Sequence, residues 1–168
     1  MAKSTANRGL KFEERFQDKC DELKKNGIAI VNKVPTSWKV IRAFVSGKSK
    51  IVNAFPEQQS KFVDFVGIMR GKAIAFECKE TDITTSFPFS NIADYQIKFL
   101  DDWLELGGLG YYLIKFTKLR EVYLVPAEIM NNCIRTIGRK SAPHKWFEET
   151  EGVILLKYNK LNIEDYIE

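Results

Sequence analysis

Apolar positions near the start of the chain repeat with the period of a helix. Phe12, Phe16, Cys20 and Leu23 follow one another at intervals of three or four residues, which places them on one face of a helix. Asn26-Gly27 comes directly after this stripe, and glycine is the usual residue just beyond a helix end. The pattern therefore predicts a first helix that ends near Gly27.

Beyond that helix the pattern changes to short runs rich in β-branched and aromatic residues, which predict strands. A second helix at about 92–106 ends at Gly107-Gly108, and a short third helix covers about 127–135. The predicted strands are 28–35, 40–45, 63–69, 73–80, 109–116 and 121–125. This order predicts one α/β domain over residues 1–168, with a mixed central sheet flanked by helices.

One stretch, at about 45–61, does not fit this scheme. It is too long for a simple hairpin turn and mixes Gly, Pro and polar residues with an apolar cluster, Ile51, Val52 and Phe55. We interpret it as a projecting insertion with a functional role, whose apolar residues pack on another surface.

Composition excludes several classes of protein. Of 168 residues, 45% are hydrophobic and 29% charged, which is ordinary for a water-soluble domain, and no run approaches the roughly 18 apolar residues of a membrane span. The first residues lack the apolar core of a signal peptide, so we expect a cytoplasmic protein. Cys20, Cys78 and Cys133 are expected to be reduced core residues, not disulfides or zinc ligands.

The net charge of +4 permits nucleic-acid binding without requiring it. Basic residues gather in two irregular stretches and in a polar N-terminal arm, which suggests contacts to a polyanion. Ordinary scatter over a solvated surface is the alternative. The candidates for DNA binding are Arg8, Arg42, Lys48, Lys50, Arg139 and Lys140.

Two acids and a lysine interrupt the paired strands 63–69 and 73–80. If the turn is a two- or four-residue loop centred on Arg70-Gly71, paired positions sum to 141 and Asp64 faces Glu77, with Cβ atoms about 4.5–5.5 Å apart. Two carboxylates this close repel unless a cation lies between them, and Mg²⁺ prefers such oxygen ligands. Lys79 lies on the same face as Glu77, where it could deprotonate a water or neutralise a phosphoryl oxygen.

These parts suit metal-assisted phosphodiester hydrolysis. The alternative is a salt-bridge ladder on the solvated face of the sheet, with Lys79 paired to either acid. Ala73 and Ala75 favour a site, because their small side chains would leave a shallow depression around the acids.

Two further polar residues lie beside apolar stripes. Gln96 occupies the stripe of the second helix, where a buried amide needs a partner, and it either caps a strand carbonyl or reaches the acids. Glu13 borders the stripe of the first helix. Its position alone fits an exposed helix acid better than a site residue.

Asp64 followed by Glu77-Cys78-Lys79 resembles the D…(D/E)-x-K signature of the nuclease superfamily that includes restriction enzymes and junction resolvases. The surrounding sequence segments are more specific, and their order is similar to that in RecU-type Holliday junction resolvases of Gram-positive bacteria and their phages. The likeness covers roughly residues 5–150. The segments are NRGLKFE (7–13), KVPT (33–36), VDFVGIMRGKAIAFECKET (63–81), TSFPF (85–89), DYQIKFL (94–100) and GRKS (138–141).

This resemblance implies a restriction-endonuclease-like fold in which Asp64 and Glu77 bind Mg²⁺, or Mn²⁺ in its place, and Lys79 assists the attacking water. Glu13 matches the family's N-terminal acid near the metal site. Gln96 matches the glutamine on the helix after the E-x-K strand.

The insertion at 45–61 corresponds to the family's stalk, which reaches into the open centre of a four-way junction. The basic start of that stalk is replaced here by SGKSK, which leaves Lys48 and Lys50 as its candidates for phosphate contact.

The resemblance further implies a homodimer that resolves Holliday junctions in recombination and DNA repair, and it admits a RecA-like recombinase as a partner. Two alternatives stay open: a nicking or restriction-type nuclease acting on duplex DNA, and a DNA-binding recombination factor that modulates a recombinase without cutting.

Overall fold

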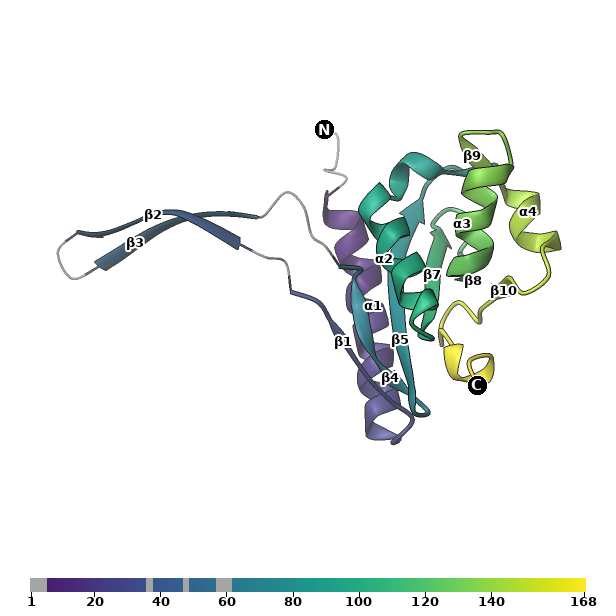
Figure 1. Ribbon diagram of the computed structural model, residues 1–168, viewed down its shortest axis with the longest axis horizontal. Coiled ribbons are helices and arrows are strands. Elements are labelled where there is room, and N and C mark those ends of the chain that lie inside the picture. The colour runs from purple at the N-terminus through teal and green to yellow at the C-terminus, as the bar shows by residue number, and fades with distance from the viewer. Residues whose placement is uncertain (1–5, 36–37, 47–48, 57–61) are drawn as a thin grey trace.

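The computed structural model describes the backbone of residues 6–35, 38–46, 49–56 and 62–168, and side chains within 11–35 and 62–168. A six-stranded sheet in the order β1-β4-β5-β7-β8-β10 forms its centre, and helices cover both faces (Figure 1). Only the β5–β7 pair is parallel within this sheet. The predicted α/β fold with a mixed sheet is therefore confirmed.

The boundaries agree with the apolar periods along most of the chain. The helices are α1 (Ala6–Lys25), α2 (Asp94–Glu105), α3 (Ala127–Thr136) and α4 (His144–Glu149). The central strands are β1 (Ala29–Lys33), β4 (Phe65–Met69), β5 (Lys72–Thr81), β7 (Leu109–Phe116), β8 (Glu121–Pro126) and β10 (Ile154–Leu155).

The β4–β5 hairpin has the predicted register. Arg70 and Gly71 both have positive φ, 48° and 80°, as a two-residue turn of the I′ type requires. Phe65 pairs with Phe76 and Met69 with Lys72, so each pair of positions sums to 141. A shift by one residue would exchange the two faces of both strands.

Both faces of the sheet are packed against a core, which corrects the expectation of a shallow depression around the acids at Ala73 and Ala75. On the α1 side, Phe16 packs edge-on against Phe65 and Phe76, with ring centroids 4.9 and 5.0 Å apart. On the opposite side, Ala75 belongs to a second core with residues from α2 and α3, whereas Ala73 is exposed. Glu77 therefore lies under a helix rather than in open solvent.

The projecting insertion is a two-stranded antiparallel hairpin, β2 (Trp38–Ser46) and β3 (Ser49–Pro56), that extends away from the body (Figure 1). It starts earlier than the predicted 45–61, because the strand predicted at 40–45 pairs with β3 and not with the central sheet. The side chains of Ile51, Val52 and Phe55 lie outside the described ones, so their predicted packing stays a prediction.

A second small sheet joins distant parts of the chain. β6 (Ser86–Pro88) pairs with β9 (Ser141–Pro143), which brings the TSFPF and GRKS segments together. Beyond it, α4, β10 and a 3-10 turn, Ile163–Asp165, complete the fold in a region for which the apolar pattern predicted no element.

Within the ranges that the structure describes, no helix combines the length and the apolar character needed to cross a bilayer.

Candidate active site

The two acids of the β4–β5 hairpin lie side by side, with Glu77 buried and Asp64 partly buried. Asp64 is one residue ahead of β4, where continuation of the register places it opposite Glu77. The backbone N–H of Asp64 donates to Glu77 Oε2 at 3.2 Å, and the N–H of Cys78 donates to Asp64 Oδ2 at 2.8 Å. Backbone donors therefore orient both carboxylates.

Burial makes this pair electrostatically unfavourable. Glu77 is completely buried; desolvation, and then the charge of Asp64, raises the pKa of its carboxyl to about 8. The pKa of Asp64 is also raised, first by burial and then by the charge of Glu13. In the absence of a further cation, the site holds protons more tightly than exposed acids would.

Lys79 provides a positive charge at the pair. Its Nζ lies 2.8 Å from Glu77 Oε1. Burial lowers the pKa of Lys79, but attraction to Glu77 and Asp64 outweighs it and the net pKa is raised. The amine is therefore protonated at neutral pH. An ion pair exists, as the salt-bridge alternative proposed, but Glu77 lies in the interior rather than on a solvated face.

Gln96 reaches the acids from α2. Its Nε2 donates to Glu77 Oε1 at 2.5 Å, and its Oε1 accepts from the backbone N–H of Ala93 at 2.9 Å. Gln96 thus ties the first turn of α2 to the carboxylate. The helix begins at Asp94, two residues later than predicted, and a 3-10 turn, Phe89–Asn91, precedes it.

Glu13 joins the site, together with a residue that the sequence reasoning missed. Glu13 Oε2 lies 2.7 Å from Nζ of Lys33; the charge of Glu13 acts on Asp64, and the charge of Asp64 acts on Lys33. Burial lowers the pKa of Lys33, but its contact with Glu13 outweighs this, so the pKa is raised. The sequence did contain a signal for Lys33, because this lysine is the first residue of KVPT, one of the segments that carry the family resemblance.

Whether the site suits a divalent cation depends on its donors. In the parts of the chain that the structure describes, no three His, Cys, Asp or Glu side chains converge as a ready-made metal cluster. Asp64 and Glu77 nevertheless present adjacent carboxylates: burial raises the pKa of both, and repulsion by Asp64 raises that of Glu77 further. A hard cation with oxygen ligands and retained waters would relieve that repulsion, so these residues fit Mg²⁺ or Mn²⁺.

The predicted DNA-binding residues divide into two groups. Arg139 and Lys140 are exposed on the loop before β9, and the carbonyl of Lys140 accepts from the N–H of Phe89, close to the start of α2. The backbone places Arg8 in α1, Arg42 in β2 and Lys50 in β3. Their side chains, and all of Lys48, lie outside the described parts.

Comparison with known proteins gives a match over nearly the whole chain. The family model of RecU, described as Recombination protein U, matches residues 7–168. This span includes the hairpin acids, α2 and the projecting hairpin.

Individual relatives agree with that match, and each bears the name Holliday junction resolvase RecU. The protein of Geobacillus sp. (strain WCH70) is 34% identical over 159 residues, which cover 90% of this chain and 78% of the relative. The protein of Geobacillus thermodenitrificans is 32% identical over 162 residues, covering 94% and 81%. That of Streptococcus gordonii is 37% identical over 147 residues, covering 86% and 73%. The chain therefore belongs to the RecU family.

Proposed function

We propose that this protein is a structure-selective endonuclease that resolves four-way DNA junctions in recombination and repair, using Mg²⁺ held by Asp64 and Glu77. The observation that carries the proposal is the buried carboxylate pair with Lys79 against it, in a chain whose relatives are named Holliday junction resolvases. A role limited to DNA binding would not need buried acids that repel phosphate.

The site residues divide the chemistry between them. Asp64 and Glu77 would hold the cation, which when bound supplies Lewis-acid stabilisation of the charge that develops on the phosphoryl oxygens. Lys79, whose Nζ lies 2.8 Å from Glu77 Oε1, would assist the attacking water or neutralise a phosphoryl oxygen. Gln96 restrains Glu77 by a hydrogen bond. The Glu13–Lys33 pair adds a second lysine on the α1 side.

The projecting β2–β3 hairpin is proposed to enter the open centre of the junction, and the loop with Arg139 and Lys140 to contact phosphates. Hairpin and site belong to the same end of the sheet, because β1 leads into the hairpin directly after Lys33, which pairs with Glu13. The hairpin's shape (Figure 1) and the basic residues in its sequence support this role.

Paired cuts in a symmetric junction require two sites related by a two-fold axis, so we propose that the protein works as a homodimer. An apolar groove of about 720 Å³ between β1 and β4 supports this and offers a surface. Ile30 and Ile68 line it, each 57% exposed. Exposed apolar patches of this kind commonly mark protein interfaces.

A cytoplasmic location and a RecA-like recombinase partner remain proposals that follow from this role. The nicking or restriction-type alternative and the non-cutting alternative make different predictions in the first experiment below.

Substitution of Asp64 by Asn should abolish cleavage of a synthetic four-way junction in Mg²⁺ or Mn²⁺ but preserve junction binding. The amide keeps an oxygen for the N–H of Cys78 while removing a charge that the cation needs. Cleavage is followed on denaturing gels and binding by mobility shift, with a matched linear duplex as control. Equal cleavage of the duplex by the wild type would favour a nicking or restriction-type enzyme. Junction binding by the wild type without cutting in either metal would favour a binding factor.

The stability of the metal-free protein should fall as pH rises from about 5 to 8. The pKa of Glu77 is about 8 in the folded state against 4.5 for the free side chain, so the folded state binds more protons across this window. For one proton, the free energy of unfolding falls by up to about 1.4 kcal/mol per pH unit. Urea denaturation in EDTA measures this, and Glu77→Gln should flatten the profile. Parallel profiles for the two proteins would contradict the assignment to Glu77.

Replacement of both Arg139 and Lys140 by Ala should weaken junction binding and reduce its log–log salt slope by about 2, roughly one for each lost phosphate contact. The charge-matched control is Lys25→Ala with Lys72→Ala, because both lysines are exposed, at the C-terminal end of α1 and at the β4–β5 turn. Binding is titrated by fluorescence anisotropy over a range of NaCl concentrations. An unchanged slope would remove this loop from the binding surface.

Substitution of Ile68 by Asp should convert a dimer into a monomer, because it places a charge within the apolar groove. The control is Leu155→Asp: Leu155 is 54% exposed and lies in β10 at the opposite edge of the sheet. Light scattering after gel filtration gives the mass of each protein. A monomeric wild type would refute the homodimer, and a dimeric Ile68→Asp variant would place the interface elsewhere.

A further inference from the structure

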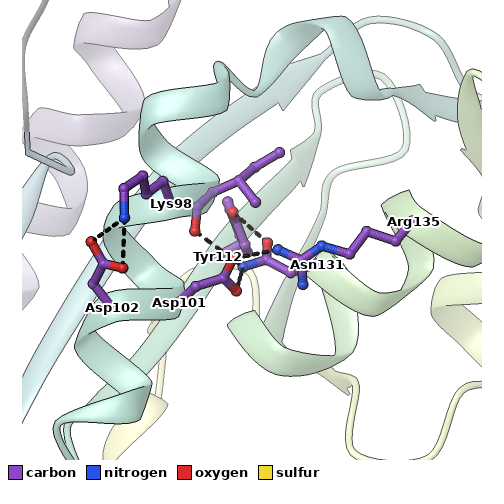
Figure 2. Close-up of polar contacts among 7 residues, drawn as sticks. Lys98, Asp101, Asp102, Tyr112, Asn131 and Arg135 are labelled. Atoms are coloured by element: carbon purple, nitrogen blue, oxygen red, sulfur yellow. Dashed lines mark hydrogen bonds and ion pairs between the residues drawn. The ribbon is translucent and has the colours of Figure 1, made fainter.

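A fully satisfied polar network lies between β7, α2 and α3 (Figure 2). The hydroxyl of Tyr112 donates to Asn131 Oδ1 at 2.8 Å. Asn131 Nδ2 donates to Asp101 Oδ1 at 2.9 Å and to the carbonyl oxygen of Ile97 at 3.4 Å. Asp101 also pairs with Arg135. Tyr112 and Asn131 are completely buried, so this network is part of the second core.

The network is connected to the catalytic carboxylates at both ends. Tyr112 is the partner of Glu77 in the parallel β5–β7 ladder. Ile97, which accepts from Asn131, directly follows Gln96, whose Nε2 bonds Glu77 Oε1. Glu77 is therefore linked to the network in two ways. One link runs through Gln96 and Ile97 on α2 to Asn131 on α3, and the other runs through its strand partner Tyr112 on β7.

The chemistry of Asn131 suits a residue that sets the position of a helix. Its side-chain oxygen accepts from Tyr112 on β7, and its amide nitrogen donates to Ile97 and Asp101 on α2. A buried amide without these partners loses the free energy of its hydrogen bonds. The bonds form only when α2 has one rotation about its axis and one height above the sheet, so this placement is favoured. Apolar neighbours such as Leu100 add burial but tolerate small displacements, because their attraction has no direction.

We propose that Asn131, acting with Tyr112, is a positioning residue: it sets α2 so that Gln96 holds the Glu77 carboxylate in place against Asp64. The metal-related part of this inference rests on the proposed role of Glu77 as a ligand. The positioning itself does not, because it concerns contacts within the metal-free protein.

The test variant is the double substitution Tyr112→Phe with Asn131→Leu, which removes both polar partners together and leaves no orphaned hydroxyl. Asp101 keeps Arg135 as a partner. Tyr112→Phe alone is a milder variant of nearly unchanged shape, in case the double variant does not fold. The matched control is Lys98→Ala with Asp102→Ala, which deletes an exposed ion pair of α2 outside the network (Figure 2).

The first readout needs neither metal nor activity. In the metal-free protein, the side-chain amide protons of Gln96, assigned by their loss in Gln96→Ala, report the bond to Glu77 by NMR. We expect them to move upfield, toward the positions of a water-exposed amide, in the double variant and part of the way in Tyr112→Phe. The control should leave them unchanged.

The second readout is junction cleavage as a function of Mg²⁺ concentration. Loss of a group that orients a metal ligand typically costs 10–100-fold in affinity, so the Mg²⁺ concentration for half-maximal rate should rise at least about tenfold, with KM for the junction unchanged. A role in stability alone would lower the melting temperature and leave the amide signal and the Mg²⁺ requirement as in the wild type, which would overturn the proposal. If Glu77→Gln cleaves normally, the proposed metal role fails while the amide signal still tests the positioning.

Discussion

The structure depends on the contact between Asp64 and Glu77 in the interior of the sheet. Burial takes hydration from both carboxylates and raises the pKa of each, and repulsion by Asp64 adds to this cost at Glu77. Two backbone N–H groups, the amide of Gln96 and the amine of Lys79 offset it in part. A protein retains such an arrangement where chemistry needs it, because an apolar pair would stabilise the same strands better.

The rest of the fold gives this pair one accessible side and two supports. α1 lies over one face of the sheet, where Phe16 packs on Phe65 and Phe76, and its first half brings Glu13 to Lys33. α2 covers the other face and delivers Gln96. The acids are thus held between two separately packed cores, which limits their movement.

Segments far apart in sequence meet at this end of the sheet. The pairing of β6 with β9 places the loop of Arg139 and Lys140 next to Phe89, close to the start of α2, although this loop is about 60 residues beyond Glu77 in the chain. This arrangement follows from strand pairing, which no local stretch of the chain specifies.

The helical stripe of α1, most strand positions and the register of the β4–β5 hairpin could all be predicted from the sequence. These depend on the periods of 3.6 and 2 and on a turn whose two residues accept positive φ. The tertiary structure alone decided that Glu77 is covered by α2, that Lys33 reaches Glu13, that the strand at 40–45 leaves the central sheet to pair with β3, and that β10 closes its far edge. Steric contacts between residues close in sequence determine whether a segment has the repeat of a helix or that of a strand. What a face packs against depends on contacts between segments tens of residues apart, which a short window of sequence does not contain.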